Sequence, residues 1–344
     1  GRALLGLAVD LGTTNTAGVI TGAEARSVGI TWAFAPVCDL DIEPKNPIVQ
    51  TRSFGVDPGA VGEHAAAWIR GCQEHGVLAC AKHYPGHGRT TQDSHAMLPR
   101  VMTAWPELER TDLVPFASAI RAGVGSVMSA FVAYPGWDPS GRAAGFSPVM
   151  LDYLRGTLGF RGLVVTDALI MAGATARQAE APATASAVAA GCDVLLYPEE
   201  FAGVIAALDR AVGGVIPVAR AEAALAHYQH AVDTWGHGPD QGEPDLAAHA
   251  AFADGLASRV THMVRGAAPV VRPPFAATIV DDDVGGPYTV GPRDVFHQAL
   301  RDAGLPVTMG TGDRGGGRGV VLVYAEPRSW KGRCTTPPPS RRAG

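Results

Sequence analysis

The residues best suited to chemistry lie in one short segment, 82–95, which contains three histidines, a lysine and an aspartate. The segment follows an apolar run at 77–81 that is typical of a buried strand. Histidine exchanges protons near neutral pH, and a nearby carboxylate can fix the tautomer of an imidazole and raise its basicity. Asp93 and His95, two residues apart, are therefore a candidate acid/base pair. Lys82 and His83 lie where the strand ends, so their side chains can point at a bound ligand.

A second candidate is the carboxylate of Asp167, which directly follows the mostly apolar run 162–166. Burying a carboxylate is costly unless it is paired or has a function. An ionised aspartate can attack an electrophilic carbon and form a covalent ester. The alternative role is the N-cap of a helix that begins at Ala168.

Other interpretations of these residues stay open at this point. The histidines can be solvated loop residues, or His83, His87, Asp93 and His95 can bind zinc. No recognised zinc spacing such as His-Glu-x-x-His is present, and Lys82 disfavours a cation, so we expect neither a metal nor another cofactor. Arg52, after a proline-containing loop, can bind sugar hydroxyls or a carboxylate, or be a surface arginine.

The segment 8–16 (Ala-Val-Asp-Leu-Gly-Thr-Thr-Asn-Thr) looks like the phosphate-binding hairpin of the actin, Hsp70 and sugar-kinase superfamily. That interpretation requires a following hairpin, whereas the next residues, with Glu24 and Arg26, have helical character. We therefore expect a helix here, and nucleotide binding stays a minor alternative.

Composition limits the possible classes of protein. The 344 residues are 47% hydrophobic and carry a formal net charge of -5, which gives no general attraction to nucleic acid or anionic membranes. No apolar run reaches the roughly 20 residues of a membrane-spanning helix, and no signal peptide is visible. Five cysteines without a Cys-x-x-Cys pair favour buried thiols over disulfides. We expect a cytoplasmic protein, with secretion or a lipid anchor as alternatives because the chain does not start with Met.

Strand and helix patterns alternate from about residue 30. Strands are expected at 32–40, 77–83, 126–132, 163–169 and 192–197. Helices are expected at 60–75, 112–122 with Asp112 as N-cap, 147–158 with Ser147 as N-cap, 183–190 and 199–212. Continuous apolar strands indicate a parallel sheet buried on both faces. Because polar residues end several strands, among them Asp39, a β/α barrel is favoured over an open doubly wound sheet.

The chain is expected to contain a catalytic domain at 1–235, a linker at 236–246 and a partial α/β domain at 247–327. The glycines and prolines of 236–244 are typical of a linker. In the second domain we expect helices at 245–264 and 295–303 and strands at 276–280 and 320–324. The basic, proline-rich tail at 328–344 is expected to be disordered.

The segment Lys-His-Tyr-Pro-Gly-His-Gly at 82–88, with Asp-Ser-His at 93–95, resembles the signature of glycoside hydrolase family 3 in its β-N-acetylhexosaminidase branch. Four further segments match in the same order: 29–39, 46–58, 146–148 and 159–169. The resemblance covers residues 15–235 closely, and the second domain resembles more loosely the C-terminal α/β domain of two-domain members.

The resemblance implies a (β/α)8 TIM-type barrel and a retaining, two-step mechanism. Asp167 falls on the nucleophile position, and His95 falls on the general acid/base position with Asp93 as its partner. Three positions match residues that hold the ring hydroxyls of N-acetylglucosamine: Arg52, Lys82 and His83. Met171, just past the nucleophile position, either lines the sugar pocket or packs in the core.

The implied activity is hydrolysis of terminal β-linked N-acetylglucosamine from cell-wall fragments or chitin-derived saccharides, so the expected partner is a carbohydrate substrate. A neutral imidazole repels anions less than a carboxylate does, so phosphate is an alternative acceptor and a phosphorylase is an alternative activity. A sugar-binding remnant without catalytic activity is a third hypothesis. Neither nucleic acid nor a membrane is expected as a partner.

One departure from the family pattern concerns the beginning of the chain. Members normally have two barrel strands and an Asp-x-Glu-Gly-Gly loop before the segment that matches 29–39, but only 28 residues precede it here. Asp10 lies in the expected helical segment, so we do not assign it the sugar-binding role of that loop's aspartate. The sequence therefore predicts a barrel that lacks its first strands, and a chain that is poorly stable or weakly active by itself.

Overall fold

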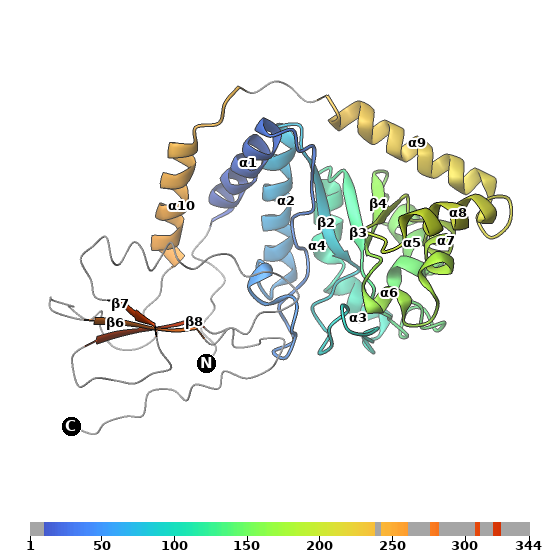
Figure 1. Cartoon of the computed structure of the whole chain (residues 1–344), viewed down its shortest axis with the longest axis horizontal. Coiled ribbons are helices and arrows are strands. Elements are labelled where there is room, and N and C mark those ends of the chain that lie inside the picture. The colour runs from blue at the N-terminus through green and yellow to red at the C-terminus, as the bar shows by residue number, and fades with distance from the viewer. Residues whose placement is uncertain (1–9, 238–241, 261–275, 282–306, 310–318, 325–344) are drawn as a thin grey trace. The chain divides into compact units, whose positions relative to one another are not determined.

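The computed structural model describes residues 10–237, 242–260, 276–281, 307–309 and 319–324 (Figure 1). The chain divides into two compact units, Gly1–Thr261 and His262–Gly344. This boundary lies after helix α10 (Leu246–Val260), whose residues from 247 onward were expected in the second domain. The expected domain limits stay a prediction. The helix expected at 295–303 and the tail at 328–344 lie outside the described residues.

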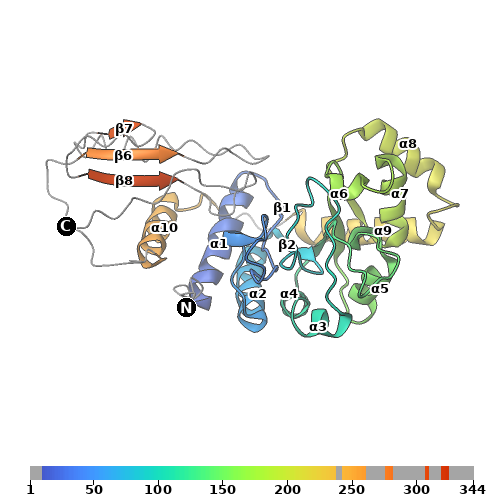
Figure 2. The same cartoon turned by 90° about the horizontal axis from the view of Figure 1, so that it is seen from below.

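A parallel sheet of five strands forms the centre of the first unit (Figures 1 and 2). Its strands are β1 (Trp32–Ala33), β2 (Leu78–Tyr84), β3 (Ser126–Ser129), β4 (Leu163–Ala168) and β5 (Val194–Leu196). They pair in sequence order, each parallel to the next. A doubly wound sheet would reverse its strand order at a switch point, whereas consecutive order is that of a β/α barrel. The expectation of a TIM-like α/β fold is therefore confirmed, with a sheet that corresponds to part of a barrel.

The two faces of this sheet bury different sets of side chains. Ala79, Val127 and Val164 pack into the large core beneath the helices. The residue that follows each of them belongs to a second cluster on the opposite face: Cys80, Met128 and Val165. Successive side chains of a strand point to opposite faces, so the second cluster lines the inner face of the curled sheet.

Helices connect the strands. They are α1 (Leu11–Ser27), α2 (Pro58–Glu74), α3 (Trp105–Arg110), α4 (Val114–Arg121), α5 (Pro148–Gly156), α6 (Ala172–Thr175), α7 (Glu180–Ala190), α8 (Phe201–Ala211) and α9 (Val218–Trp235), with 3-10 turns η1 (Gln50–Arg52) and η2 (Ala144–Phe146). Ser147 caps α5 as expected, because its side chain accepts a hydrogen bond from the Met150 N–H at 3.3 Å. The helices expected at 60–75, 183–190 and 199–212 are α2, α7 and α8.

Two local expectations are wrong. The strand expected at 32–40 is regular only at β1, and beyond it a single bridge joins Val37 to Lys82. Pro36 interrupts this segment because proline has no N–H to donate to a neighbouring strand. Asp112 does not cap α4, which has Leu113 at its N-cap position. The Asp112 carboxylate instead accepts hydrogen bonds from the side chains of Arg89 and Thr111.

The nucleotide-binding interpretation of 8–16 is wrong because helix α1 occupies 11–16, where a hairpin turn was required; residues 8 and 9 lie outside the described residues. Asp10 is the N-cap of α1, and its Oδ1 accepts a hydrogen bond from the Thr13 N–H at 2.8 Å. Helix α1 packs tightly against α2, as Figure 1 shows. A Cβ atom on Gly18 would lie 2.3 Å from the Trp68 carbonyl oxygen, so only glycine permits this approach.

The described part of the second unit is a parallel sheet in the order β7–β6–β8. Strands β6 (Ala276–Asp281) and β8 (Gly319–Tyr324) confirm two expected strands, and β7 (Val307–Met309) adds a third that was not expected.

Four cysteines, Cys38, Cys72, Cys80 and Cys192, are buried and free. None of the helices described in either unit combines the length and the apolar character needed to cross a lipid bilayer.

Candidate active site

The carboxyl ends of β2 and β4 bring Lys82 and Asp167 to one face of the sheet. Each follows by two residues a member of the inner-face cluster, Cys80 and Val165 respectively. The two-residue period of a strand therefore directs Lys82 and Asp167 toward the inner face. Lys82 interacts electrostatically with Asp167 and Arg52, which shows that the three charges share one neighbourhood. Burial and the charge of Arg52 lower the pKa of Lys82, although Asp167 opposes them.

Asp39 connects His83, near the end of β2, to His87 in the loop that follows the strand. Its fully buried carboxylate accepts hydrogen bonds from the backbone N–H groups of His83 at 3.1 Å and His87 at 2.7 Å. Its Oδ2 lies 2.7 Å from Nδ1 of His83. Burial raises the pKa of Asp39, but the neighbouring His83 and His87 outweigh that effect and hold it below the usual value. Asp39 therefore fixes both the backbone of this loop and the imidazole of His83.

His87 has a structural role in the loop. Its Nδ1 lies 2.9 Å from the Thr90 hydroxyl, and its Nε2 lies 3.0 Å from the Ser94 hydroxyl. Burial lowers the pKa of His87 to about 4, so the ring is neutral at neutral pH. Its bond to Ser94 holds the segment on which Asp93 and His95 lie. Across the part of the chain that the structure describes, no three His, Cys, Asp or Glu side chains are grouped to hold a metal ion.

Asp93 and His95 make the contact that their spacing predicts. Oδ1 of Asp93 lies 2.8 Å from Nδ1 of His95 and accepts a second bond from the His95 N–H at 2.8 Å. The His95 side chain is 26% exposed, so the imidazole is accessible to a ligand. Oδ2 of Asp93 is buried without a hydrogen-bond partner among the described residues. The role of this pair in proton transfer stays a prediction.

The loop that contains His95 is attached to the segment that follows Asp167. The N–H of Ala172 donates to the His95 carbonyl at 3.3 Å, and the N–H of Gly173 donates to the Ser94 carbonyl at 2.9 Å. A Cβ on Gly173 would lie 2.9 Å from the Ser94 oxygen, so glycine permits the close approach. The imidazole and the carboxylate thus come from adjoining segments at the same edge of the sheet.

Asp167 lies within β4 and is half-buried. Its Oδ1 accepts a hydrogen bond from the Ala168 N–H at 2.8 Å, and the described residues provide no other hydrogen bond to this carboxylate. The helix that follows, α6, begins at Ala172 and has Met171 at its N-cap position. The alternative role of Asp167 as a helix N-cap is therefore wrong.

Two predicted ligand-binding residues lie in different environments. Arg52 is exposed at the end of η1, and its guanidinium donates to the Ile48 carbonyl at 3.4 Å. Met171 is 3% exposed and belongs to the large core, which favours the core role that the sequence left open. Sugar binding by these residues, and by Lys82 and His83, stays a prediction.

Sequence reasoning missed three residues that position the site. Asp39 was noted only as a polar residue at a strand end and received no role of its own, although a carboxylate after an apolar strand is the same signal that identified Asp167. The Asn46 amide donates to the His87 carbonyl at 2.8 Å, and the Tyr134 hydroxyl donates to the Gly86 carbonyl at 2.6 Å. These two contacts join distant segments, so no local pattern indicates them.

The comparisons with known proteins agree on one family. Residues 3–230 match the family described as glycosyl hydrolase family 3 N terminal domain. A beta-hexosaminidase of Chromobacterium violaceum is 43% identical over 197 residues, which are 56% of this chain and 54% of that protein. A beta-N-acetylglucosaminidase/beta-glucosidase of Cellulomonas fimi is 32% identical over 323 residues, which are 85% of this chain and 57% of that protein.

A solved structure shows the same similarity in three dimensions. The glycoside hydrolase family 3 beta-N-acetylglucosaminidase from Paenibacillus sp. str. FPU-7 superposes with a TM-score of 0.79 at 28% identity, over 93% of this chain and 63% of that one. The chain therefore spans somewhat more than half the length of each of these three relatives.

Proposed function

The chain belongs to glycoside hydrolase family 3, and on this premise we propose that it releases terminal β-linked N-acetylglucosamine from cell-wall or chitin-derived saccharides. The observation that carries the proposal is the contact between Asp93 and His95 in a loop attached to the segment after Asp167. The relatives from Chromobacterium violaceum and Cellulomonas fimi, a beta-hexosaminidase and a beta-N-acetylglucosaminidase/beta-glucosidase, support the same class of activity. A carbohydrate is accordingly the proposed partner.

The proposed fold of the active protein is a (β/α)8 barrel followed by an α/β domain. Strands β1 and β5 each pair with only one neighbour among the described residues. Further strands on these two edges would close the curled sheet into a barrel and cover its edges. The strands β6, β7 and β8 would belong to the second domain.

In the first step of the proposed mechanism, the Asp167 carboxylate attacks the anomeric carbon and forms a glycosyl ester. The bond from that carbon to the leaving oxygen breaks, and the imidazolium of His95 gives its proton to that oxygen. In the second step, the neutral imidazole takes a proton from water, the water oxygen attacks the anomeric carbon, and Asp167 leaves as a carboxylate. Asp93 stabilises the imidazolium through its contact with Nδ1.

Substrate binding is proposed for the side chains around this pair. Arg52, Lys82 and His83 would hydrogen-bond the ring hydroxyls of the terminal sugar. His83 is suited to this because Asp39 fixes the orientation of its ring. Ordered donors of this kind favour one bound geometry and reduce the entropy lost on the way to the transition state.

Covalent trapping tests the proposal directly. A 5-fluoro N-acetylglucosaminide with a good leaving group should label the chain, and peptide mapping should place the label on Asp167. The Asp167→Ala variant should remain unlabelled. A label on another residue would exclude Asp167 as the nucleophile. Binding of the sugar without labelling or turnover would instead support the sugar-binding remnant.

The acceptor is a separate question, because the proposed base is an imidazole, which is neutral when it accepts a proton. A neutral base repels phosphate less than a carboxylate does, which favours a phosphorylase as the second candidate. Products formed in phosphate buffer and in a buffer without phosphate distinguish the two. Free sugar in both buffers supports the hydrolase, and sugar 1-phosphate in the first supports the phosphorylase.

A further inference from the structure

A cavity of about 220 Å³ lies among the loops that follow β2, β3 and β4. Leu98 comes from the first of these loops, Arg142 and Phe146 from the second, and Arg177 and Gln178 from the third. Ser186 of α7 completes the polar part of its lining. The cavity thus combines apolar walls with two guanidinium groups and two neutral polar side chains, a composition common in small-molecule sites.

Two arginines, Arg142 and Arg177, line this cavity, and the guanidinium of a third, Arg100, lies near that of Arg177. The guanidinium nitrogens of Arg100 lie 3.6 and 3.7 Å from the position that a Cβ of Gly141 would occupy, and Nη1 of Arg177 lies 3.7 Å from the same point. Arg142 follows Gly141 directly in the chain and lines the cavity with Arg177. All three side chains are exposed, so water screens part of their mutual repulsion, and an anion bound between them would remove the rest.

Within the described part of the chain, no carboxylate lies within ion-pair distance of these arginines. Among the residues that the structure describes, Arg100, Arg142 and Arg177 take part in no ion pair of 4.0 Å or less. Asp138 interacts with Arg142 at longer range, but its carboxylate already accepts bonds from the Ser140 N–H at 2.9 Å and the Ser147 hydroxyl at 2.6 Å. The lining itself contains no acidic residue.

The three arginines are held to different degrees. Nη1 of Arg177 donates to the carbonyls of Ser140 at 3.0 Å and Gly141 at 2.9 Å, which fixes the position of its guanidinium. The side chains of Arg100 and Arg142 make no hydrogen bond within the described ranges. The cavity therefore has one preorganised guanidinium and two that are free to turn toward a ligand. Guanidinium groups bind carboxylate and phosphate oxygens in a planar, two-bond geometry.

We propose that this cavity is a binding site for an oxyanion, the phosphate or carboxylate group of a small organic molecule. Arg142 and Arg177 bind the anion, Arg100 adds its charge, and the N–H groups of the Gln178 amide offer further hydrogen bonds. The Ser186 hydroxyl donates to the Pro182 carbonyl at 2.9 Å and so contributes only to the lining. The apolar walls formed by Leu98 and Phe146 contact the carbon skeleton of the ligand. None of its lining residues belongs to the predicted catalytic or sugar-binding set, and the cavity adjoins the Asp93–His95 segment through Gly173, whose N–H donates to the Ser94 carbonyl.

Titration calorimetry of the full chain tests the site with four probes: inorganic phosphate, glucose 6-phosphate, glucuronate and glucose. The three anions should bind, more weakly as ionic strength rises, and glucose should not. Arg142→Gln is the main variant, because the side chain of Arg142 makes no hydrogen bond within the described residues and its loss should leave the fold intact. Its dissociation constants for the anions should rise at least about tenfold, the usual effect of losing a charged hydrogen bond.

Two further variants complete the design. Arg70→Gln removes one exposed positive charge from α2, outside the cavity, and should bind the anions as the unmodified chain does. Arg177→Gln should weaken binding further than Arg142→Gln, with its thermal midpoint measured to confirm that the loop remains folded. Tighter binding of glucose 6-phosphate than of inorganic phosphate would show that the apolar walls contribute. Equal affinity of the Arg142→Gln and Arg70→Gln variants, or no binding of any anion, would overturn the proposal.

Discussion

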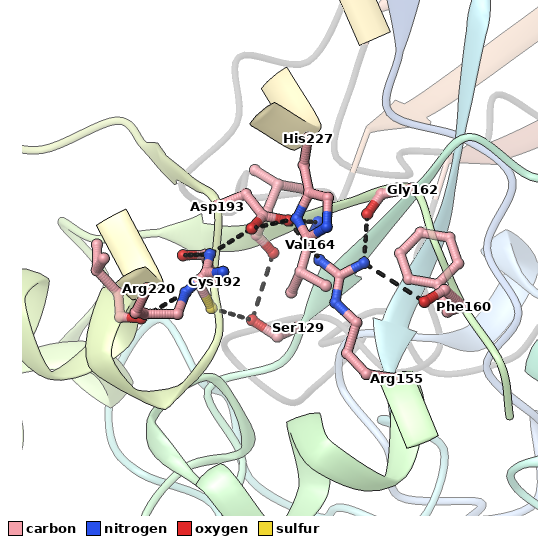
Figure 3. Close-up of polar contacts among 11 residues, drawn as sticks. Ser129, Arg155, Phe160, Gly162, Val164, Cys192, Asp193, Arg220 and His227 are labelled. Carbon is pink, nitrogen blue, oxygen red and sulfur yellow. Dashed lines mark hydrogen bonds and ion pairs between the residues drawn. The ribbon is translucent and has the colours of Figure 1, made fainter. Parts of the chain in front are cut away.

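Two aspartates near opposite ends of β4 have opposite surroundings. Asp193 is fully buried beside Val164 at the amino end, and both of its oxygens have partners (Figure 3). Asp167 lies at the carboxyl end, where its hydrogen bond within the described residues comes from the Ala168 N–H. A carboxylate whose oxygens are all bonded cannot attack a carbon without losing those bonds. The comparison therefore separates an aspartate that stabilises the fold from one that is available for chemistry.

The Asp193 cluster joins two helices to the sheet, as Figure 3 shows. The carboxylate pairs with Arg155 of α5 and with Arg220 of α9, and it lies 3.0 Å from Nδ1 of His227. It also accepts a hydrogen bond from the Val164 N–H of β4 at 2.9 Å. Burial lowers the pKa of Arg155, although the charge of Asp193 opposes that effect. This cluster attaches α5 and α9 to the sheet at the edge opposite the candidate site.

The largest effect on turnover is expected when Asp167 is replaced. In Asp167→Asn, turnover of a chromogenic N-acetylglucosaminide should fall on the order of 10⁴-fold, because an amide cannot form the glycosyl ester. The free energy of unfolding should change little, since Asp167 is half-buried and sparsely bonded. Steady-state kinetics and urea unfolding measure the two quantities. A large loss of stability with unchanged turnover would reverse the comparison between the two aspartates.

A smaller effect is expected for the proposed acid/base. In His95→Gln, kcat for a glycoside with a poor leaving group should fall by roughly 10²- to 10³-fold, because protonation of the leaving oxygen is lost. With a nitrophenyl leaving group, which departs without protonation, the loss in the first step should be less than about tenfold. Kinetics over a series of leaving groups provides the measurement. Equal losses for all leaving groups would mean that His95 positions the site and transfers no proton.

The buried aspartate should show the opposite behaviour. Asp193→Asn leaves Arg155 and Arg220 with uncompensated charge, so the free energy of unfolding should fall by about 3 kcal/mol. Turnover per folded molecule should be unchanged, because the cluster lies at the other edge of the sheet. Asp209→Asn, an exposed position on α8, is the control and should change stability by less than about 0.5 kcal/mol. A loss of turnover beyond the loss of folded protein would contradict this assignment.

The same two aspartates show what a sequence can predict. Asp167 and the Asp93–His95 pair are visible because the signals are local: a carboxylate after an apolar strand, and two groups two residues apart. Asp193 lies next to an apolar strand as well, directly before β5. Its partners, Arg155 and Arg220, come from two helices that are distant in the sequence. Only the packing of α5 and α9 against the sheet brings these charges together, so no spacing rule indicates them.

The expectations that were wrong have a related cause. Asp112 precedes an apolar, helical segment, which is the usual signal for an N-cap. The structure uses its carboxylate to bind Arg89, a residue of the loop after β2, and the tertiary contact overrides the local preference. Alternating strands and helices left both a barrel and a doubly wound sheet possible, and the polar residues at the strand ends favoured the barrel, whose strands pair in consecutive order. The exact length of β1 could not be predicted, because it depends on where its pairing with β2 ends.

The smallest expected effect is a change in the pH dependence of stability that is due to His87. Like the two aspartates, histidines at the two ends of the strands have different surroundings. His227 contacts a carboxylate, whereas His87 is fully buried between two hydroxyls, and burial lowers its pKa to about 4. The ordinary value near 6.5 applies in the unfolded chain, so the unfolded chain binds more protons between about pH 6.5 and pH 4. The stability due to the neutral ring is complete above this range and is lost as pH falls through it. From about pH 7.5 to about pH 5, this loss should reach about 2 kcal/mol.

The His87→Gln variant isolates this contribution, because glutamine does not titrate and can still hydrogen-bond a neighbouring hydroxyl. Urea unfolding of both proteins at the two pH values gives the difference. Carboxylates titrate in both proteins and cancel to a first approximation, so the unmodified chain should lose about 2 kcal/mol more than the variant. Equal losses would mean that His87 is protonated in the folded state near pH 5. The loop would then tolerate a charge beside Asp39, and its attachment to the Asp93–His95 segment through Ser94 would not require a neutral ring.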